Sequence, residues 1–162
     1  MEKSVVQFIG MLLGPAALGY LLNFALEVSA LVRGRWGTIA LFMSLVTIFT
    51  LWYLGRAFGR SVQGGWRGLI AAVLAPGIPA ALYFWQFYLV SPGSRIPLFA
   101  LIPQLYFTPL VWPVARFLGD MGLGGDRLVG TVSLALMVTL VVSGYLRGAA
   151  EAFRQARGSN GR

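Results

Sequence analysis

The stretch SRIPLFALIPQLYFTPLVWPVARFLGD, residues 94–120, decides how this chain is interpreted. It is apolar enough to enter a lipid bilayer, yet it contains Pro97, Pro103, Pro109 and Pro113. A proline within a helix removes a backbone hydrogen bond and clashes with the preceding turn. A bilayer offers no water to the carbonyl that has lost its donor. The segment must therefore either kink as it crosses the membrane or break into two short pieces that other protein covers.

The composition of the whole chain is that of a membrane protein. Of its 162 residues, 57% are hydrophobic and 11% are charged, with a mean hydropathy of +0.75, whereas soluble domains carry about 25% charged residues. A soluble protein of this size could not bury so many apolar side chains. We predict an integral membrane protein whose net charge of +8 favours a lipid bilayer with anionic headgroups as its partner. We do not expect it to bind nucleic acid.

Five segments are long enough to cross the hydrocarbon core, which takes about 20 residues of helix. We predict an all-α integral membrane protein, a bundle of five transmembrane helices that forms one domain over residues 1–157, followed by a disordered tail at 158–162. The expected spans are residues 5–32, 36–54, 69–90, 96–118 and 128–146, the last continuing as a helix to residue 157.

The proline-rich segment leaves a second topology open, four spans plus a re-entrant hairpin at 96–118 with helix breaks at Pro103 and Pro109. Its pieces on either side of Pro109 are each about 15 Å long or less, half a membrane. If all five segments cross, Lys and Arg divide six to seven between the two sides of the membrane; if 96–118 returns, they divide eight to five, with both termini on the richer side. The positive-inside rule favours the hairpin, whereas the length of the segment favours a crossing. The near-even first division also permits a dual-topology dimer.

We place the protein in a cytoplasmic membrane of the bacterial type as a multi-pass protein, with its C-terminal tail in the cytoplasm. Gly10 and Gly14 on the first span have the GxxxG spacing typical of close helix association, within the chain or between subunits. Glycine is also common in membrane helices in general, so the pair has an equally plain explanation.

Polar side chains inside the spans are costly in lipid and mark candidate sites. The first and third spans run in the same direction and the fourth begins where the third ends, so their polar residues fall in the same half of the membrane. We predict a ligand- or ion-binding cleft there, roofed by the broken segment. Its candidate residues are Tyr20, Asn23, Glu27, Tyr83, Gln86, Gln104 and Thr108.

A structural role for these residues is the alternative. Glu27 could pair with Arg33, Arg35 or Arg95 near the membrane surface. Amides could bond between helices, at about 0.6 kcal/mol on average in a membrane protein. If Glu27 is functional, it is the only acid placed deep enough to carry a proton or a cation.

The chain has no histidine and no cysteine, and no nucleophile stands beside a base. We therefore expect no enzyme activity, no cofactor and no metal site. Two functions remain open. The first is a transporter or channel, or the membrane subunit of one, that forms a homo-oligomer and moves a small solute or ion through the cleft near Glu27. The second is a non-catalytic accessory or assembly subunit that docks with a larger membrane-protein partner.

Overall fold

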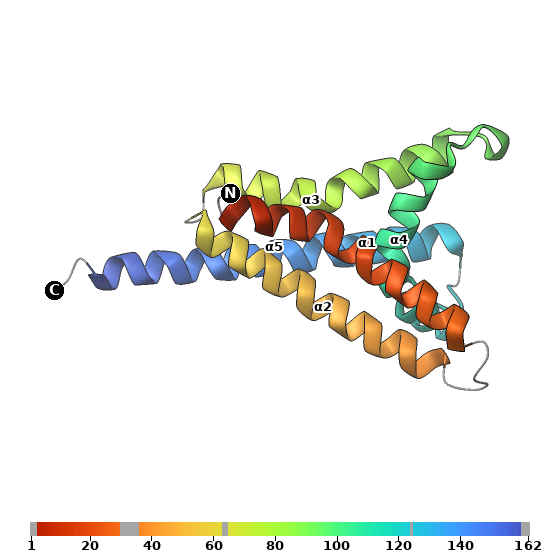
Figure 1. Cartoon of the computed structure of the whole chain (residues 1–162), viewed down its shortest axis with the longest axis horizontal. Coiled ribbons are helices and arrows are strands. Elements are labelled where there is room, and N and C mark those ends of the chain that lie inside the picture. The colour runs from red at the N-terminus through yellow and green to blue at the C-terminus, as the bar shows by residue number, and fades with distance from the viewer. Residues whose placement is uncertain (1–2, 30–35, 63–64, 124, 160–162) are drawn as a thin grey trace.

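The structure is a computed structural model and describes residues 3–29, 36–62, 65–123 and 125–159. Five helices in these ranges are long and apolar enough to cross a membrane, as the sequence predicts (Figure 1). They are α1 (Lys3–Ser29), α2 (Trp36–Ser61), α3 (Trp66–Phe84), α4 (Pro97–Asp120) and α5 (Asp126–Ser159). A π-helical turn, η1 (Trp85–Leu89), continues α3, and a 3-10 turn, η2 (Pro92–Ser94), precedes α4.

Two helices extend beyond their predicted ends, and the other bounds agree within three residues when η1 is counted with α3. α2 continues past residue 54 to Ser61, because Gly55 and Gly59 in this added part pack on α5. α5 ends at Ser159, two residues into the predicted disordered tail. Residues 160–162 lie outside the described ranges.

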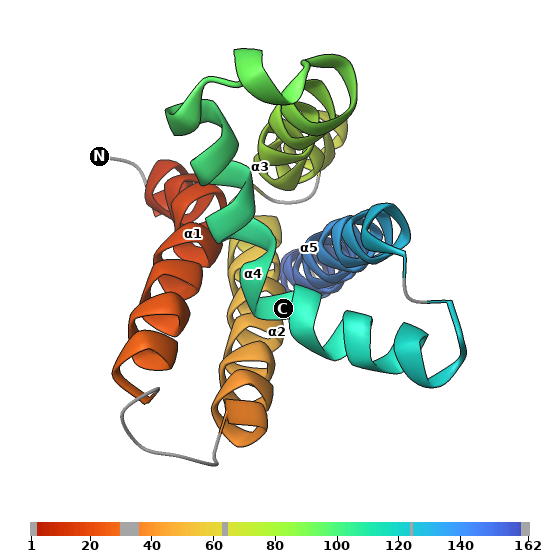
Figure 2. The same ribbon diagram turned by 90° about the vertical axis from the view of Figure 1, so that its right-hand side faces the viewer.

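α4 lies across one end of the bundle, whereas the other four long helices run roughly along it. Figure 1 shows α1, α2, α3 and α5 extended along the long axis, and Figure 2 shows α4 from the side while α3 and α5 are seen nearly end-on. α5 therefore begins at the end of the bundle where α4 also begins. The first turns of α1 and the last turns of α5 lie at the other end (Figure 1).

α2 and α5 pack closely enough for their backbones to meet. A Cβ on Gly55 would lie 2.5 Å from the carbonyl oxygen of Val141, and one on Gly59 would overlap the carbonyl oxygen of Tyr145. Because the residue numbers rise together on both sides, the two helices run in the same direction. Small residues four apart let membrane helices approach in this way. Two glycines of α5 face the α2 backbone in return, Gly144 and Gly148.

The predicted association pair, Gly10 and Gly14, faces α2 of the same chain. A Cβ on Gly10 would lie 3.5 Å from the nearest side-chain carbon of Leu54, and one on Gly14 would lie 3.9 Å from that side chain. Both distances are ordinary van der Waals contacts, so this pair allows an approach that larger residues would also allow.

Three of the carbonyls that prolines leave without a helical donor face a neighbouring helix. In α1, Pro15 has no N–H to offer the carbonyl of Met11 four residues earlier. Tyr106 of α4 is fully buried, and its hydroxyl donates to that carbonyl oxygen at 3.0 Å. This tyrosine belongs to the proline-rich segment, so α4 supplies the hydrogen bond that α1 lacks.

Two carbonyls of α4 are met in return. Pro113 frees the carbonyl of Pro109, and the buried Ser44 hydroxyl of α2 donates to it. Pro109 frees the carbonyl of Leu105, which lies so close to α1 that a Cβ on Gly19 would overlap its oxygen. A glycine Cα–H is a weak donor at such a crossing. Pro109 and Pro113 are therefore tolerated in this apolar segment because α1 and α2 cover the carbonyls that they free.

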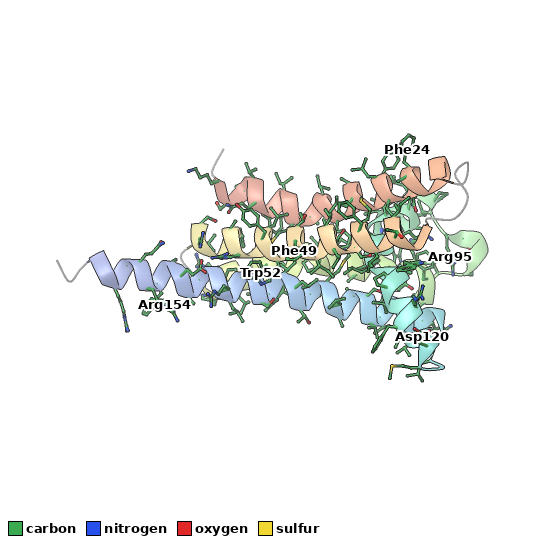
Figure 3. The ribbon with its side chains drawn as sticks, turned by 90° about the horizontal axis from the view of Figure 1, so that it is seen from below. Phe24, Phe49, Trp52, Arg95, Asp120 and Arg154 are labelled. Atoms are coloured by element: carbon green, nitrogen blue, oxygen red, sulfur yellow. The ribbon has the colours of Figure 1, made fainter. Side chains whose placement is uncertain are left out.

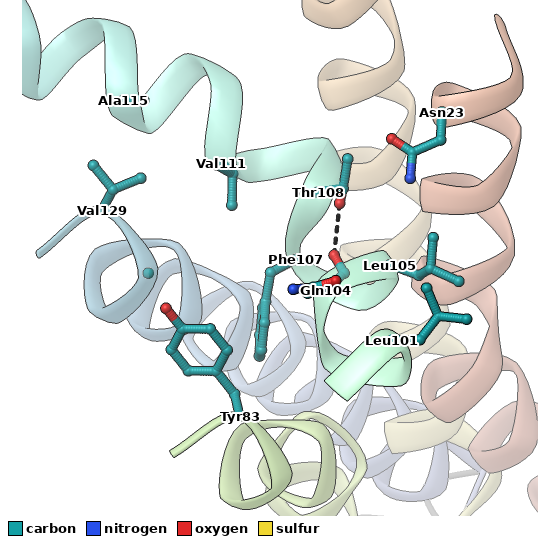
Figure 4. Close-up of a pocket in the computed structure, with 11 residues that line it drawn as sticks. Asn23, Tyr83, Leu101, Gln104, Leu105, Phe107, Thr108, Val111, Ala115 and Val129 are labelled. Carbon is teal, nitrogen blue, oxygen red and sulfur yellow. Dashed lines mark hydrogen bonds between the residues drawn. The ribbon is translucent and has the colours of Figure 1, made fainter. Parts of the chain in front are cut away.

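α4 is bent but remains one helix. The sequence predicts helix breaks at Pro103 and Pro109, whereas the helix is continuous from Pro97 to Asp120. Its direction changes between Thr108 and Val111, as Figures 2 and 4 show. A proline at this position accounts for a bend of this kind.

The outer surface of the bundle is strongly apolar. Phe24 on α1 is 58% exposed and Phe49 on α2 is 68% exposed, and Phe24 projects from the edge of the bundle in Figure 3. Such a surface suits a hydrocarbon solvent and would be unusual on a soluble monomer. The buried core includes Met11, Leu51, Phe58, Tyr106, Leu110, Met137, Val141 and Tyr145.

Candidate functional site

A cavity of about 460 Å³ lies between α1, α3, α4 and α5 (Figure 4). Its wall is mostly apolar and carries a few polar groups, the usual composition of a small-molecule site, which typically measures about 300–1,000 Å³. It is lined by Asn23, Tyr83, Leu101, Gln104, Leu105, Phe107, Thr108, Val111, Ala115, Val129 and Gly130.

Four polar side chains from three helices reach this cavity. In Figure 4, Asn23 of α1 and Tyr83 of α3 stand on opposite sides, with Gln104 and Thr108 of α4 between them. The Thr108 hydroxyl donates to the backbone carbonyl of Gln104 at 2.6 Å, so its oxygen is left to accept from a ligand. The two carboxamides each offer both a donor and an acceptor.

Tyr83 is held in place by aromatic neighbours and by a glycine. Its ring stacks on Phe87 with centroids 5.0 Å apart and meets Phe107 edge-on at 5.6 Å. Its hydroxyl reaches α5 at Gly130, where a Cβ would overlap it. The phenol therefore enters the cavity wall because residue 130 has no side chain.

The described lining residues carry no formal charge, and among them only Tyr83 is titratable. The cavity can therefore recognise a ligand by hydrogen bonding and apolar contact more readily than by charge. Within the described residues, no three Asp or Glu side chains come together to hold a metal ion.

The structure brings together four of the seven predicted site residues: Asn23, Tyr83, Gln104 and Thr108. Tyr20 is 61% exposed and does not line the cavity. Glu27 belongs to α1, one turn beyond Asn23, but its side chain lies outside the described part, as do Arg33 and Arg35.

Gln86 is fully buried, and its side chain forms a hydrogen bond with the backbone. Its Oε1 accepts the N–H of Ile96, the residue before α4, at 3.2 Å. Gln86 lies in η1, where the N–H of Val90 bonds to the carbonyl of Trp85 at 3.1 Å. A π-helical turn changes the face on which the following side chains lie, so α-helical spacing cannot predict the direction of Gln86.

Sequence reasoning missed the apolar wall of the cavity. Val111 and Ala115 come from the second half of α4, and Val129 and Gly130 come from the start of α5. In a membrane helix such residues look the same whether they face lipid, protein or a cavity. Only the bend in α4 brings its second half against α5.

Comparisons of the chain with protein-family models, with curated proteins and with solved structures found no match. Its function must therefore be inferred from the cavity and from the arrangement of the helices.

Proposed function

We propose that this multi-pass membrane protein is a small transporter that binds an uncharged, partly apolar solute in the cavity beside α4. One observation carries this proposal: Asn23, Tyr83, Gln104 and Thr108, which come from three different helices, converge on one largely apolar cavity. Polar side chains are costly inside a membrane and usually mark a substrate path or a structural contact. Their grouping around open space favours the substrate path.

The topology that we propose has four crossings, made by α1, α2, α3 and α5, with α4 confined to one half of the membrane. Oε1 of Glu151 in α5 lies 2.7 Å from Nη2 of Arg56, which is near the end of α2. If all five helices crossed in alternation, these two residues would lie on opposite sides of the membrane. Four crossings also divide the basic residues eight to five, with the richer side cytoplasmic.

A bent helix confined to one half of the membrane can form one wall of a solute site. Irregular backbone at membrane depth is tolerated where protein or a cavity surrounds it, and transporters often build their binding sites from interrupted helices near the midplane. α4 contributes Gln104 and Thr108 just before its bend. A change in the bend would therefore move two of the four polar groups.

Cysteine labelling tests the topology on a chain that has no native cysteine. Single variants Ser4→Cys, Ser94→Cys and Ser159→Cys are labelled in sealed vesicles with an impermeant maleimide. We expect Ser4→Cys and Ser159→Cys to react from the same side and Ser94→Cys from the other. Reaction of Ser4→Cys and Ser159→Cys from opposite sides would mean that α4 crosses.

Solute binding is tested with the purified protein reconstituted into liposomes. A panel of uncharged solutes graded in size, from glycerol to nucleosides, is screened by osmotic swelling and by the shift in unfolding temperature. For any solute that binds in this screen, Gln104→Leu and Asn23→Leu should each weaken binding about tenfold, the usual effect of losing one or two buried hydrogen bonds. Gln155→Leu, which changes an exposed amide outside the cavity, should change binding less than twofold.

A tyrosine pair gives a finer control. Tyr83→Phe removes a hydroxyl at the cavity, whereas Tyr20→Phe removes one from the exposed surface of α1. Equal effects of the two substitutions, or no solute in the panel that depends on Gln104, would count against a solute site in this cavity.

Glu27 provides the test of coupling to protons. If solute movement draws on a proton gradient, Glu27→Gln should abolish the pH dependence of uptake into these liposomes while solute binding is retained. Unchanged pH dependence in this variant would exclude Glu27 as the coupling group.

An accessory subunit is the second candidate, and the end of α5 favours it. This helix projects beyond the bundle and carries exposed Phe153, Arg154 and Arg157 (Figures 1 and 3). Purification from native membrane in mild detergent, followed by mass spectrometry, separates the two functions. Stoichiometric recovery with a larger membrane protein that is lost in Phe153→Ser would favour the accessory subunit. Recovery as a homo-oligomer would favour the transporter.

A further inference from the structure

A second polar cavity, of about 290 Å³, lies at the end of the bundle away from α4. Gln7 from the start of α1 forms one side, and one face of the last turns of α2 forms the other. The α2 residues are spaced three and four apart, so they lie on the same helix face. The cavity is lined by Gln7, Tyr53, Arg56, Ala57, Arg60 and Ser61.

The arginines of this cavity belong to a cluster in which, among the described residues, three guanidinium groups bond to one carboxylate. Glu151 of α5 accepts from Arg56 Nη2 at 2.7 Å, from Arg60 Nε at 2.6 Å and from Arg147 Nε at 3.1 Å. Glu151 lies past Leu146, beyond the apolar part of α5. The hydrogen bond from Arg56, with help from Arg60, lowers the pKa of Glu151 to about 2. Within the part of the chain that the structure describes, three guanidiniums thus share one ionised carboxylate, which leaves two positive charges of this cluster without an acidic partner there.

Gln7 has an unmet hydrogen-bonding group on the other side of the cavity. Its Oε1 is buried and accepts from no donor among the described residues. A buried acceptor without a partner is costly. An occupant that suits this cavity would present an anion to the arginines and a hydroxyl or amine donor to Gln7.

The aromatic residues around the cavity place it at the level of lipid headgroups. The Arg56 guanidinium lies over the ring of Trp52, 5.3 Å from its centroid, and Tyr53 is 64% exposed. Trp and Tyr favour the boundary between hydrocarbon and water. This end of the bundle also carries most of the basic residues under the four-crossing topology, and anionic lipids are concentrated in the cytoplasmic leaflet.

An exposed apolar stripe leads from the cavity into the membrane. Tyr53, Phe49 and Leu45 follow one another at intervals of four residues on α2, and they are 64%, 68% and 46% exposed. An acyl chain attached to a headgroup in the cavity would lie along this stripe. A free phosphate ester of the same headgroup chemistry would gain nothing from it.

We propose that this cavity binds the headgroup of an anionic phospholipid with a headgroup hydroxyl, of the phosphatidylglycerol type. The phosphodiester lies against the free N–H groups of Arg56 and Arg60, and the headgroup hydroxyl donates to Gln7 Oε1. The site lies at the other end of the bundle from the solute cavity, so it stands or falls independently of the transport proposal.

The experiment is native mass spectrometry of the full-length protein in detergent, titrated with three lipids. Phosphatidylglycerol has the charge and the hydroxyl, phosphatidylmethanol has the charge alone, and phosphatidylcholine has no net charge. We expect affinity to fall in that order. Arg60→Gln should weaken both anionic lipids about tenfold, since a charge-assisted hydrogen bond is lost. Gln7→Leu should weaken phosphatidylglycerol alone, down to the level of phosphatidylmethanol.

Two variants at the end of α5 are matched controls, because both residues are exposed and neither lines the cavity. Arg154→Gln makes the same change of charge as Arg60→Gln, and Gln155→Leu makes the same change of side chain as Gln7→Leu. Both should alter lipid affinity less than twofold. Gln7→Leu leaves the arginine cluster intact, so its effect is readable even if Arg60→Gln disturbs folding.

Three results would overturn the proposal. The first is equal binding of phosphatidylcholine and phosphatidylglycerol by the unaltered protein. The second is an equal loss of affinity in Arg60→Gln and Arg154→Gln, which would mean a diffuse surface charge. The third is displacement of phosphatidylglycerol by free glycerol phosphate at the same concentration, which would assign the site to a soluble phosphate ester.

Discussion

Replacing Tyr106 by phenylalanine removes a single hydroxyl and tests how this fold tolerates its prolines. The side chain is fully buried, and its hydroxyl donates to the Met11 carbonyl that Pro15 leaves without a helical donor. Phenylalanine retains the ring and its packing. The substitution should therefore leave one carbonyl unmet in the membrane interior and change little else.

The expected cost is about 1 kcal/mol. Leaving a buried acceptor unpaired costs about 1–3 kcal/mol in proteins generally, but interhelical hydrogen bonds in a membrane protein average about 0.6 kcal/mol and reach about 1.7. A value near 1 kcal/mol changes the unfolding equilibrium about fivefold. Tyr20→Phe, on the exposed surface of α1, should cost close to nothing.

The decisive measurement is a double-mutant cycle with Pro15→Ala. Alanine restores an N–H four residues after Met11, so the carbonyl regains a donor from its own helix. Tyr106→Phe should then cost less than about 0.3 kcal/mol in the Pro15→Ala background, because the cycle isolates the coupling between the two positions. Free energies of unfolding are measured for all four proteins in the same detergent micelles.

An equal cost of Tyr106→Phe in both backgrounds would refute this reasoning. The tyrosine hydroxyl would then stabilise the protein in some way unrelated to the carbonyl that Pro15 frees. If Pro15→Ala alone fails to fold, the same reasoning is tested by a second cycle. Ser44→Ala and Pro113→Ala are combined there, because Ser44 donates to the Pro109 carbonyl that Pro113 frees.

Two further predictions concern the packing of α2 on α5. Gly148→Ala places a Cβ on the Arg56 carbonyl and should lower the free energy of unfolding by about 1–3 kcal/mol. Gly10→Ala, whose new Cβ would lie 3.5 Å from Leu54, should change the free energy of unfolding by less than about 0.5 kcal/mol. Similar costs of the two substitutions would contradict the backbone contact between α2 and α5. Because the pKa of Glu151 is lowered from 4.5 to about 2 in the folded protein, its stabilising effect is complete above pH 4.5 and is lost as the pH falls toward 2. The difference in unfolding temperature between the unaltered protein and Glu151→Gln should accordingly be constant from pH 8 to pH 5 and shrink below pH 4.5, and a difference that is unchanged at pH 3 would exclude this origin.

The helices and the site were predictable to different degrees. Hydrophobic runs located all five helices, because length and hydropathy are local properties. The direction of α4, by contrast, is not set by local sequence. It depends on contacts with α1 and α2 that involve Tyr106, Ser44 and Gly19. The pairing of α2 with α5 is not local either, because it runs through glycines on both helices, two of which lie in a segment interrupted by arginines. The GxxxG spacing points instead to Gly10 and Gly14, whose contacts with Leu54 are ordinary.

Counting helix turns predicted which polar side chains come together where the helix is regular. Asn23, Gln104 and Thr108 lie on regular α-helix and reach one cavity. Gln86 lies in a π-helical turn and bonds to the Ile96 N–H instead. Tyr20, three residues before Asn23, lies on the exposed side of α1 and does not reach the cavity.

The proline-freed carbonyls also limit how the proposed solute cavity can open. α4 is tied to α1 by Tyr106 and by the Leu105 carbonyl against Gly19, and it is tied to α2 by Ser44. A motion that separated α4 from both neighbours would leave these carbonyls bare in hydrocarbon, where each unmet group is costly. Opening is therefore cheaper if α4 stays with α1 and α2, which also keeps α5 in place because α2 and α5 pack backbone to backbone, and α3 moves away. Such a motion separates Asn23 and Gln104 from Tyr83, so it would open the cavity between its polar walls.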